Sequence, residues 1–118
     1  MTKNIVGFKC IGAINPFYDS LNAIDSIPHN TSLKYIDLSR CDLSLYDFLS
    51  VMAVLSGAKA LTHINMSNNK ITGDRNDICY NAIKSLYNLT IFNLKNNPLH
   101  EFRVKKWREA NPLVELIF

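Results

Sequence analysis

The side chain best suited to acid–base chemistry is His63, because histidine titrates near neutral pH. A histidine base also needs a nucleophile or a carboxylate within reach, and Cys41 and Asp37 are the candidates. The sequence shows no motif that would hold a serine or cysteine nucleophile on a strained turn, no paired acids and no glycine-rich phosphate loop. We therefore predict that the chain is not an enzyme and has no small-molecule substrate.

Three cysteines, Cys10, Cys41 and Cys79, could in principle bind a metal or form disulfides. Their number is odd, and neither C-x-x-C spacing nor paired flanking cysteines occur. We interpret them as structural residues in a reducing compartment, and we expect no metal and no cofactor. Lys9 interrupts the apolar residues near the start, so no signal peptide or membrane span is expected. These features predict a cytoplasmic protein or, alternatively, a translocated effector that acts inside a host cell.

Four basic residues lie between positions 103 and 108 and could contact nucleic acid or an acidic membrane. The alternative is a solvated helix whose cations suit the helix C-terminus. Val104 and Trp107 would share one face of such a helix, with Phe102 nearby, which favours a role in the core. The net charge of +3 is mild. We therefore consider a nucleic-acid partner unlikely.

The stretch that organises the chain is 61–71, which reads Leu-Thr-His-Ile-Asn-Met-Ser-Asn-Asn-Lys-Ile. Its apolar residues and Asn69 fit the pattern L-x-x-L-x-L-x-x-N-x-L. The pattern also begins 28 positions earlier at Leu33 and 28 positions later at Leu89. Weaker copies begin at Ile5 and Leu113. Such agreement at a constant period indicates a repeat architecture, in which stacked repeats share one continuous core.

This pattern resembles that of leucine-rich-repeat proteins, and its period is similar to that of the ribonuclease-inhibitor-like subclass. The segment from Asn97 to Phe118 is similar to the C-terminal cap of intracellular leucine-rich-repeat proteins. The resemblance implies an α/β leucine-rich-repeat solenoid, a short right-handed horseshoe with parallel strands on the concave face and helices on the convex face. It also implies that the protein acts as a scaffold that binds other proteins.

The pattern predicts a single domain over residues 1–118. Alternate residues of each short strand should point inward, and the asparagine or cysteine after each strand should bond to the backbone of the neighbouring repeat. The predicted units are an atypical N-terminal repeat at 1–32, repeats at 33–60, 61–88 and 89–112, and a terminal cap strand at 113–118.

Helices should return the chain between the strands. The first begins at Asn15-Pro16, which suit the N-cap and the first helical position. The second begins at a capping box formed by Ser44 and Asp47 and runs to about Ala58. Asp74 could cap the third. The inward residues of the second and third helices are predicted to be Leu45, Phe48, Met52 and Leu55, then Ile78, Ala82, Ile83 and Leu86.

The concave positions are where members of this family usually hold their partners. The column Tyr35, His63 and Ile91 combines two aromatic side chains with an apolar one, which is typical of a protein-recognition surface. The alternative interpretation is that these are merely solvent-tolerant strand residues. The candidate partner-binding residues are Tyr35, Asp37, Arg40, His63, Asn65, Asn68, Ile91, Asn93 and Lys95.

We therefore predict a non-catalytic scaffold that binds a partner protein through its concave strand face. One alternative is a structural module that self-assembles as a homodimer through open sheet edges, since an uncovered edge strand can pair with another chain. Another is a small effector-type regulator that mimics a host scaffold. The scaffold interpretation expects a monomer, whereas edge pairing expects a dimer.

Overall fold

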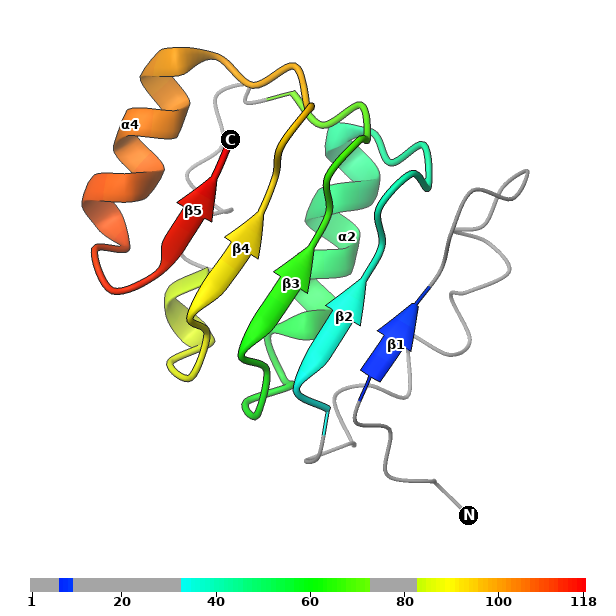
Figure 1. Cartoon of the computed structure of the whole chain (residues 1–118), viewed down its shortest axis with the longest axis vertical. Helices are drawn as coiled ribbons and strands as arrows, with labels where there is room; N and C mark the ends of the chain where they lie inside the picture. The colour runs from blue at the N-terminus through cyan, green and yellow to red at the C-terminus, as the bar shows by residue number, and fades with distance from the viewer. Residues whose placement is uncertain (1–6, 10–32, 73–82) are drawn as a thin grey trace.

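The computed structural model describes residues 7–9, 33–72 and 83–118 (Figure 1). Its strands form one parallel sheet in which spatial order follows sequence order, as in a stacked-repeat solenoid. Two helices have defined bounds, α2 (Leu45–Leu55) and α4 (Glu101–Ala110). The strands are β1 (Gly7–Lys9), β2 (Tyr35–Asp37), β3 (His63–Asn65), β4 (Ile91–Asn93) and β5 (Glu115–Ile117).

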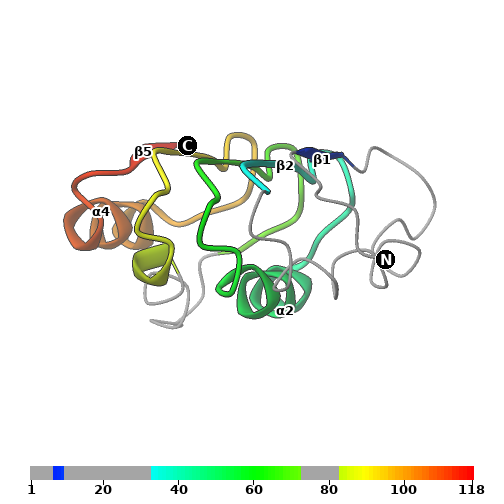
Figure 2. The ribbon, with the colours of Figure 1, turned by 90° about the horizontal axis from the view of Figure 1, so that it is seen from below.

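Both labelled helices lie on one side of the sheet, as Figure 2 shows. No described helix covers the opposite side. Parallel sheets are usually buried on both faces, so a parallel sheet with one bare face is notable. We call this bare face the strand face. It comprises the exposed side of β2 to β5, the residue before each strand and up to three residues after it.

The register of the sheet reproduces the 28-residue period. Ile36 pairs with Ile64, and Ile64 pairs with Phe92. Phe8 in β1 pairs with Ile36 at the same spacing, whereas Leu116 in β5 pairs with Phe92 at the shorter spacing of 116 − 92 = 24 residues. The α/β leucine-rich-repeat solenoid expected from the sequence is therefore confirmed, because inward positions one period apart stack directly on one another.

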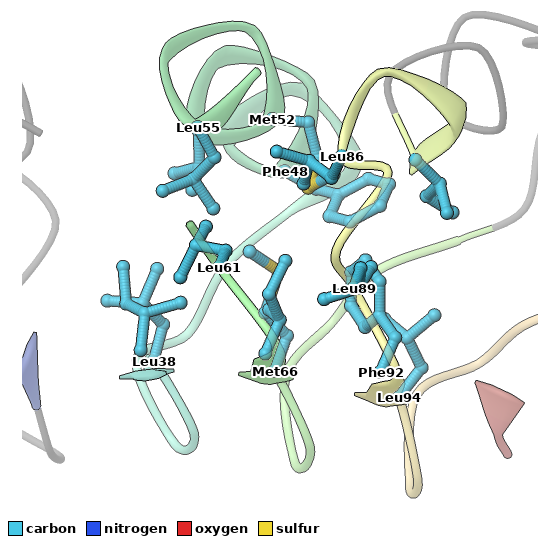
Figure 3. Close-up of a cluster of buried hydrophobic side chains, with 14 of the residues drawn as sticks. Leu38, Phe48, Met52, Leu55, Leu61, Met66, Leu86, Leu89, Phe92 and Leu94 are labelled. Atoms are coloured by element: carbon cyan, nitrogen blue, oxygen red, sulfur yellow. The ribbon is translucent and has the colours of Figure 1, made fainter. Parts of the chain in front are cut away.

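The core lies between the sheet and the helices. Leu38, Met66 and Leu94 from the strand segments face Met52 and Leu55 of α2 in Figure 3, and all five are buried. The repeats described from Leu33 onward all contribute to this one cluster, so each of them depends on its neighbours for burial.

Aromatic rings join the middle of the core to its C-terminal end. Phe48 of α2 lies with its ring centroid 6.3 Å from that of Phe92 and 6.0 Å from that of Trp107. The Trp107 ring lies 6.3 Å from that of Phe118. Such spacing is within the range of favourable aromatic pairs. The chain of rings therefore connects α2, β4, α4 and the residue after β5.

The capping box at the start of α2 is confirmed. Asp47 Oδ2 accepts hydrogen bonds from the Ser44 backbone N–H and hydroxyl, both at 3.0 Å, and Ser44 Oγ accepts one from the Asp47 N–H at 3.3 Å. The helix ends at Leu55 rather than near Ala58, because the Ala58 N–H bonds to the Leu55 carbonyl in a tight turn.

The inward side of α2 differs from the prediction at two residues. Phe48, Met52 and Leu55 are buried as expected, whereas Leu45 is only half-buried and Val51 is buried in addition. Leu45 is the first residue of the helix, where the chain has just left the turn after the strand segment. The buried stripe therefore begins one turn later than the sequence pattern suggests.

The C-terminal end corrects two expectations. Leu113 is 92% exposed, so the prediction that it begins the terminal strand as an inward residue is wrong. It lies in a turn closed by the Val114 N–H and the Asn111 carbonyl, and β5 starts only at Glu115. Phe102 is 56% exposed rather than part of the core, whereas Trp107 is buried.

Some expectations lie outside the described residues. These are the helix beginning at Asn15-Pro16, the cap at Asp74, and Ile78 and Ala82 of the third helix. Within the described part, Ile83 and the nearby Leu86 are buried, as predicted. In the same ranges, the helices are all too short or too polar to cross a membrane.

Candidate functional site

The strand face is built on an asparagine ladder. Asn69 Oδ1 accepts hydrogen bonds from the backbone N–H groups of Cys41 and Leu43, both at 3.0 Å. Its Nδ2 donates to the carbonyls of Leu38 at 3.0 Å and Met66 at 2.9 Å. The predicted role of this residue, bonding to the backbone of the neighbouring repeat, is confirmed.

Asn97 repeats these contacts one period later. Its Oδ1 accepts from the Ile71 N–H at 3.1 Å, and its Nδ2 donates to the Met66 and Leu94 carbonyls, both at 2.9 Å. Each ladder side chain thus ties its own turn to the turn of the preceding repeat. This arrangement holds the strand ends rigidly in register.

Three residues at equivalent turn positions have left-handed backbones. Arg40, Asn68 and Asn96 have φ values of 55°, 58° and 61°. Apart from glycine, asparagine is one of the residues that adopt this backbone most readily, whereas arginine is not. The two asparagines also bond to each other, with Asn96 Nδ2 donating to Asn68 Oδ1 at 2.9 Å. Among these three residues, Arg40 is therefore the one whose left-handed backbone costs the most conformational free energy.

Replacing Arg40 with asparagine is expected to raise the free energy of unfolding by about 1 kcal/mol, because asparagine tolerates the left-handed backbone better. Urea unfolding followed by circular dichroism measures this. Arg40→Lys is the control and should give no gain, since lysine has no such tolerance. An Arg40→Asn variant that is no more stable than the natural protein would contradict this account of the turn.

The polar column Asp37, Asn65 and Asn93 is used by the fold itself. In each case a side-chain Oδ1 accepts the backbone N–H two residues on, at 2.9 Å for Asp37 and 3.0 Å for Asn65 and Asn93. These contacts are Asx turns that end the three strands. The Oδ1 atoms of these three candidate partner-binding residues are therefore already hydrogen-bonded within the chain.

Asp37 corrects the predicted contact set most clearly. The residue is only 5% exposed, and its Oδ2 accepts a hydrogen bond from the Tyr35 hydroxyl at 3.3 Å. A partner cannot reach this carboxylate directly. Asp37 instead orients Tyr35, so we remove it from the residues expected to touch a partner.

The column before the strands is also internally bonded. Thr62 Oγ1 donates to the Lys34 carbonyl at 3.0 Å, and Thr90 Oγ1 donates to the Thr62 carbonyl at 2.9 Å. Lys34 occupies the equivalent position before β2, and its side chain is exposed. Lys34 lies one residue before Tyr35 in the repeat. This position is the sequence signal that could have added Lys34 to the candidate residues.

The central column is the part of the strand face that stays open. Tyr35, His63, Ile91 and Glu115 are aligned across four strands. Tyr35 is 41% exposed, His63 and Ile91 are half-buried, and Glu115 is exposed. Partial burial raises the pKa of Tyr35, and the adjacent Asp37 carboxylate raises this pKa further. The Tyr35 hydroxyl therefore stays neutral at physiological pH.

His63 has a defined orientation in this column. Its Nδ1 lies 2.8 Å from Thr62 Oγ1. The single hydroxyl proton of Thr62 is donated to the Lys34 carbonyl, so we assign the proton of this contact to His63 Nδ1. In neutral His63 the Nε2 atom is then the hydrogen-bond acceptor available to a partner.

The three groups considered for acid–base chemistry are each hydrogen-bonded to other residues. His63 bonds to Thr62, Asp37 bonds to Ser39 N–H and the Tyr35 hydroxyl, and the buried Cys41 thiol donates to the Ser39 carbonyl at 3.4 Å. Each of these contacts has a structural role. Among the residues that the structure describes, no group of three His, Cys, Asp or Glu side chains could hold a metal ion.

A pocket of about 600 Å³ at the C-terminal end was not anticipated. Leu99, Val104 and Phe118 supply apolar walls, and Lys105 and Arg108 of α4 supply positive charge. Its lining also contains Glu101 and Glu109, so the charge is balanced. The sequence gives no signal for this pocket, because it forms only where α4 meets the turn after β4 and the end of β5.

Comparisons with known proteins agree with the repeat architecture. The family model described as Leucine Rich Repeat matches residues 60–82. A solved structure of leiomodin-1 actin-binding site 2 is similar with a TM-score of 0.77 and 18% identity, covering 95% of this chain and 69% of that one.

A second structure, an internalin from Listeria monocytogenes strain 4b F2365, has a TM-score of 0.46 and 14% identity, covering 92% of this chain and 32% of that one. No curated protein matches the sequence significantly. The matched motif, the 28-residue register of the sheet and the likeness in fold together show that this chain contains a leucine-rich repeat and has an α/β solenoid fold like that of leucine-rich-repeat structures.

Proposed function

We propose that the chain is a non-catalytic module that holds a partner protein against its strand face. The observation that carries this proposal is the central column, Tyr35, His63 and Ile91, on a parallel sheet that no described helix covers on this side. Aromatic residues at the centre of a surface are the type that most often dominates binding energy. Parallel sheets are usually covered on both faces, so a bare face is consistent with a surface that a partner covers.

The hydrogen bonds around the column support the proposal energetically. The Asx turns at Asp37, Asn65 and Asn93 and the threonine bonds before β3 and β4 satisfy polar groups within the chain. A partner that covers these groups leaves their hydrogen bonds intact, so little is lost on desolvation. The ladder also fixes the strand ends before binding, which lowers the ordering cost of association.

The comparisons support the coarse form of this proposal. Leucine-rich repeats typically present extended binding surfaces to other proteins. The similar leiomodin-1 segment is named as an actin-binding site, which is a protein-binding role on the same fold. At 18% identity the likeness shows fold alone, so actin itself is not carried over to this chain.

Affinity capture from a cell lysate, quantified by mass spectrometry, tests the proposal. A variant with Tyr35→Ala, His63→Ala and Ile91→Ala should recover the bound protein at least tenfold less well, because two or more central contacts are lost. The matched control is Tyr46→Ala with Tyr87→Ala, which removes exposed tyrosines from outside the strand face. Circular dichroism confirms that both variants are folded.

Equal capture by the natural protein and the strand-face variant would refute the proposal. Loss with the control variant alone would also refute it and would place the binding surface on the helix side.

Self-assembly through the sheet edge is the second candidate. It is favoured by β5, which ends the sheet, and by the exposed Leu113 beside it. An edge strand presents unpaired backbone groups that another chain can bond. Light scattering separates the two candidates. The strand-face module is a monomer, whereas edge pairing gives a dimer that Ile117→Lys should dissociate.

A further inference from the structure

The charged residues of the strand face are unevenly distributed. Lys34, Arg40 and Lys95 are exposed. Of the two acids on this face, Asp37 is buried with both oxygens bonded within the chain, and only Glu115 is exposed. The surface that a partner meets around Tyr35 and His63 is therefore positively charged.

The cations lie at both ends of the strands. Lys34 comes directly before β2, whereas Arg40 and Lys95 follow β2 and β4. Strands in a sheet are about 4.8 Å apart, so β2 and β4 are separated by roughly 10 Å. An extended chain advances about 3.3 Å per residue, so about three residues span this distance. Two acidic side chains at that spacing, on a partner segment that runs across the strands, could therefore face Arg40 and Lys95 together.

Arg40 provides a second, independent observation. It holds a left-handed backbone with φ of 55° where the next two repeats have asparagine, which suits that backbone better. Strained residues persist where the surrounding structure holds them, and they gather at binding sites. Its guanidinium is also the cation best suited to bind a carboxylate through two hydrogen bonds. The strain is explained if an exposed arginine at this turn is useful for binding.

We propose that the partner segment held on the strand face is an acidic protein segment with an apolar anchor, whose carboxylates contact Lys34, Arg40 and Lys95. This inference rests on the proposed function. The apolar anchor covers Tyr35 and Ile91, and the carboxylates sit at the strand ends. A protein segment fits better than nucleic acid, because three separated cations and an exposed Glu115 do not form the dense basic patch that a phosphate backbone needs.

The test selects ligands without assuming a sequence. A library of random twelve-residue peptides displayed on phage is selected on the natural protein, and the selected peptides are measured by fluorescence anisotropy at two salt concentrations. The peptides should be enriched in Asp and Glu around an aromatic or aliphatic residue. Their binding should weaken as salt increases, because salt screens exposed charge pairs.

Two charge variants, each confirmed as folded by circular dichroism, make the test specific. Lys34→Glu with Arg40→Asp and Lys95→Glu should weaken binding of the selected peptides at least tenfold. Aspartate is used at position 40 because it tolerates the left-handed backbone. The control, Lys84→Glu with Lys105→Glu and Lys106→Glu, changes the net charge by the same amount away from the strand face and should bind as the natural protein does.

The outcomes separate this inference from the proposed function. Selected peptides that require Tyr35, His63 and Ile91 but show no acidic bias would overturn the inference and leave the proposed function standing. Equal weakening by both charge variants, or tighter binding of a fluorescein-labelled single-stranded DNA than of any peptide, would also overturn the inference. If no selected peptide depends on the strand face, or none is selected, the inference fails together with the proposed function.

Discussion

Replacing Asn69 with alanine is expected to lower the free energy of unfolding by about 4 kcal/mol. The substitution leaves the backbone N–H groups of Cys41 and Leu43 and the carbonyl of Leu38 without their side-chain partner, whereas the Met66 carbonyl keeps its hydrogen bond from Asn97. Each buried polar group left unpaired costs about 1 to 3 kcal/mol. The expected loss is a large fraction of the 5 to 15 kcal/mol that is typical of a natural domain.

Urea unfolding monitored by circular dichroism measures the loss, and Asn97→Ala is the matched control. Asn97 makes the same kind of contacts but is only half-buried, so water can replace part of what is lost. Its variant should lose about half as much stability. A loss below about 1 kcal/mol for Asn69→Ala would mean that water or backbone movement satisfies the freed groups, and that the ladder does not hold the repeats together.

Truncating Phe48 to alanine is expected to cost about 4 kcal/mol. The ring is fully buried and contacts the rings of Phe92 and Trp107. Removing it leaves a cavity where α2, β4 and α4 meet. The cost combines the lost burial of the ring with the cavity that remains.

The control for this prediction is Phe102→Ala, which removes the same side chain from an exposed position of α4. Its cost should stay below about 1 kcal/mol. Trp107 is the only tryptophan in the chain and stacks on Phe48, so Phe48→Ala should also shift its fluorescence. Similar losses for the two phenylalanine variants would show that the core is not organised around Phe48.

Both predictions concern contacts between repeats, which is where a solenoid keeps its stability. Asn69 joins its own turn to the turn of the preceding repeat. Phe48 joins its repeat to Phe92, which lies two repeats further on, and to the C-terminal helix. A short solenoid has few such interfaces, so loss of one affects the whole chain. The strand face depends on the same interfaces, because they hold Tyr35, His63 and Ile91 in one line.

The sequence alone determined the parts of the structure that follow from a local periodic pattern. The spacing of apolar residues predicted the strands and their register, and it placed Asn69 and Asn97 in the ladder. The resemblance to leucine-rich-repeat proteins implied the parallel order. The capping box at Ser44 and Asp47 was also visible, because cap and partner are three residues apart. In each case the residues that interact are close in sequence or one repeat apart.

Only the tertiary structure decided which residues of the strand face remain available. A periodic pattern distinguishes inward from outward positions, but it does not show which outward groups bond within the fold. Asp37 is buried, Arg40 has a left-handed backbone and Leu113 is exposed. These features follow from the three-dimensional path of the turns, which an inward–outward pattern of the chain does not contain.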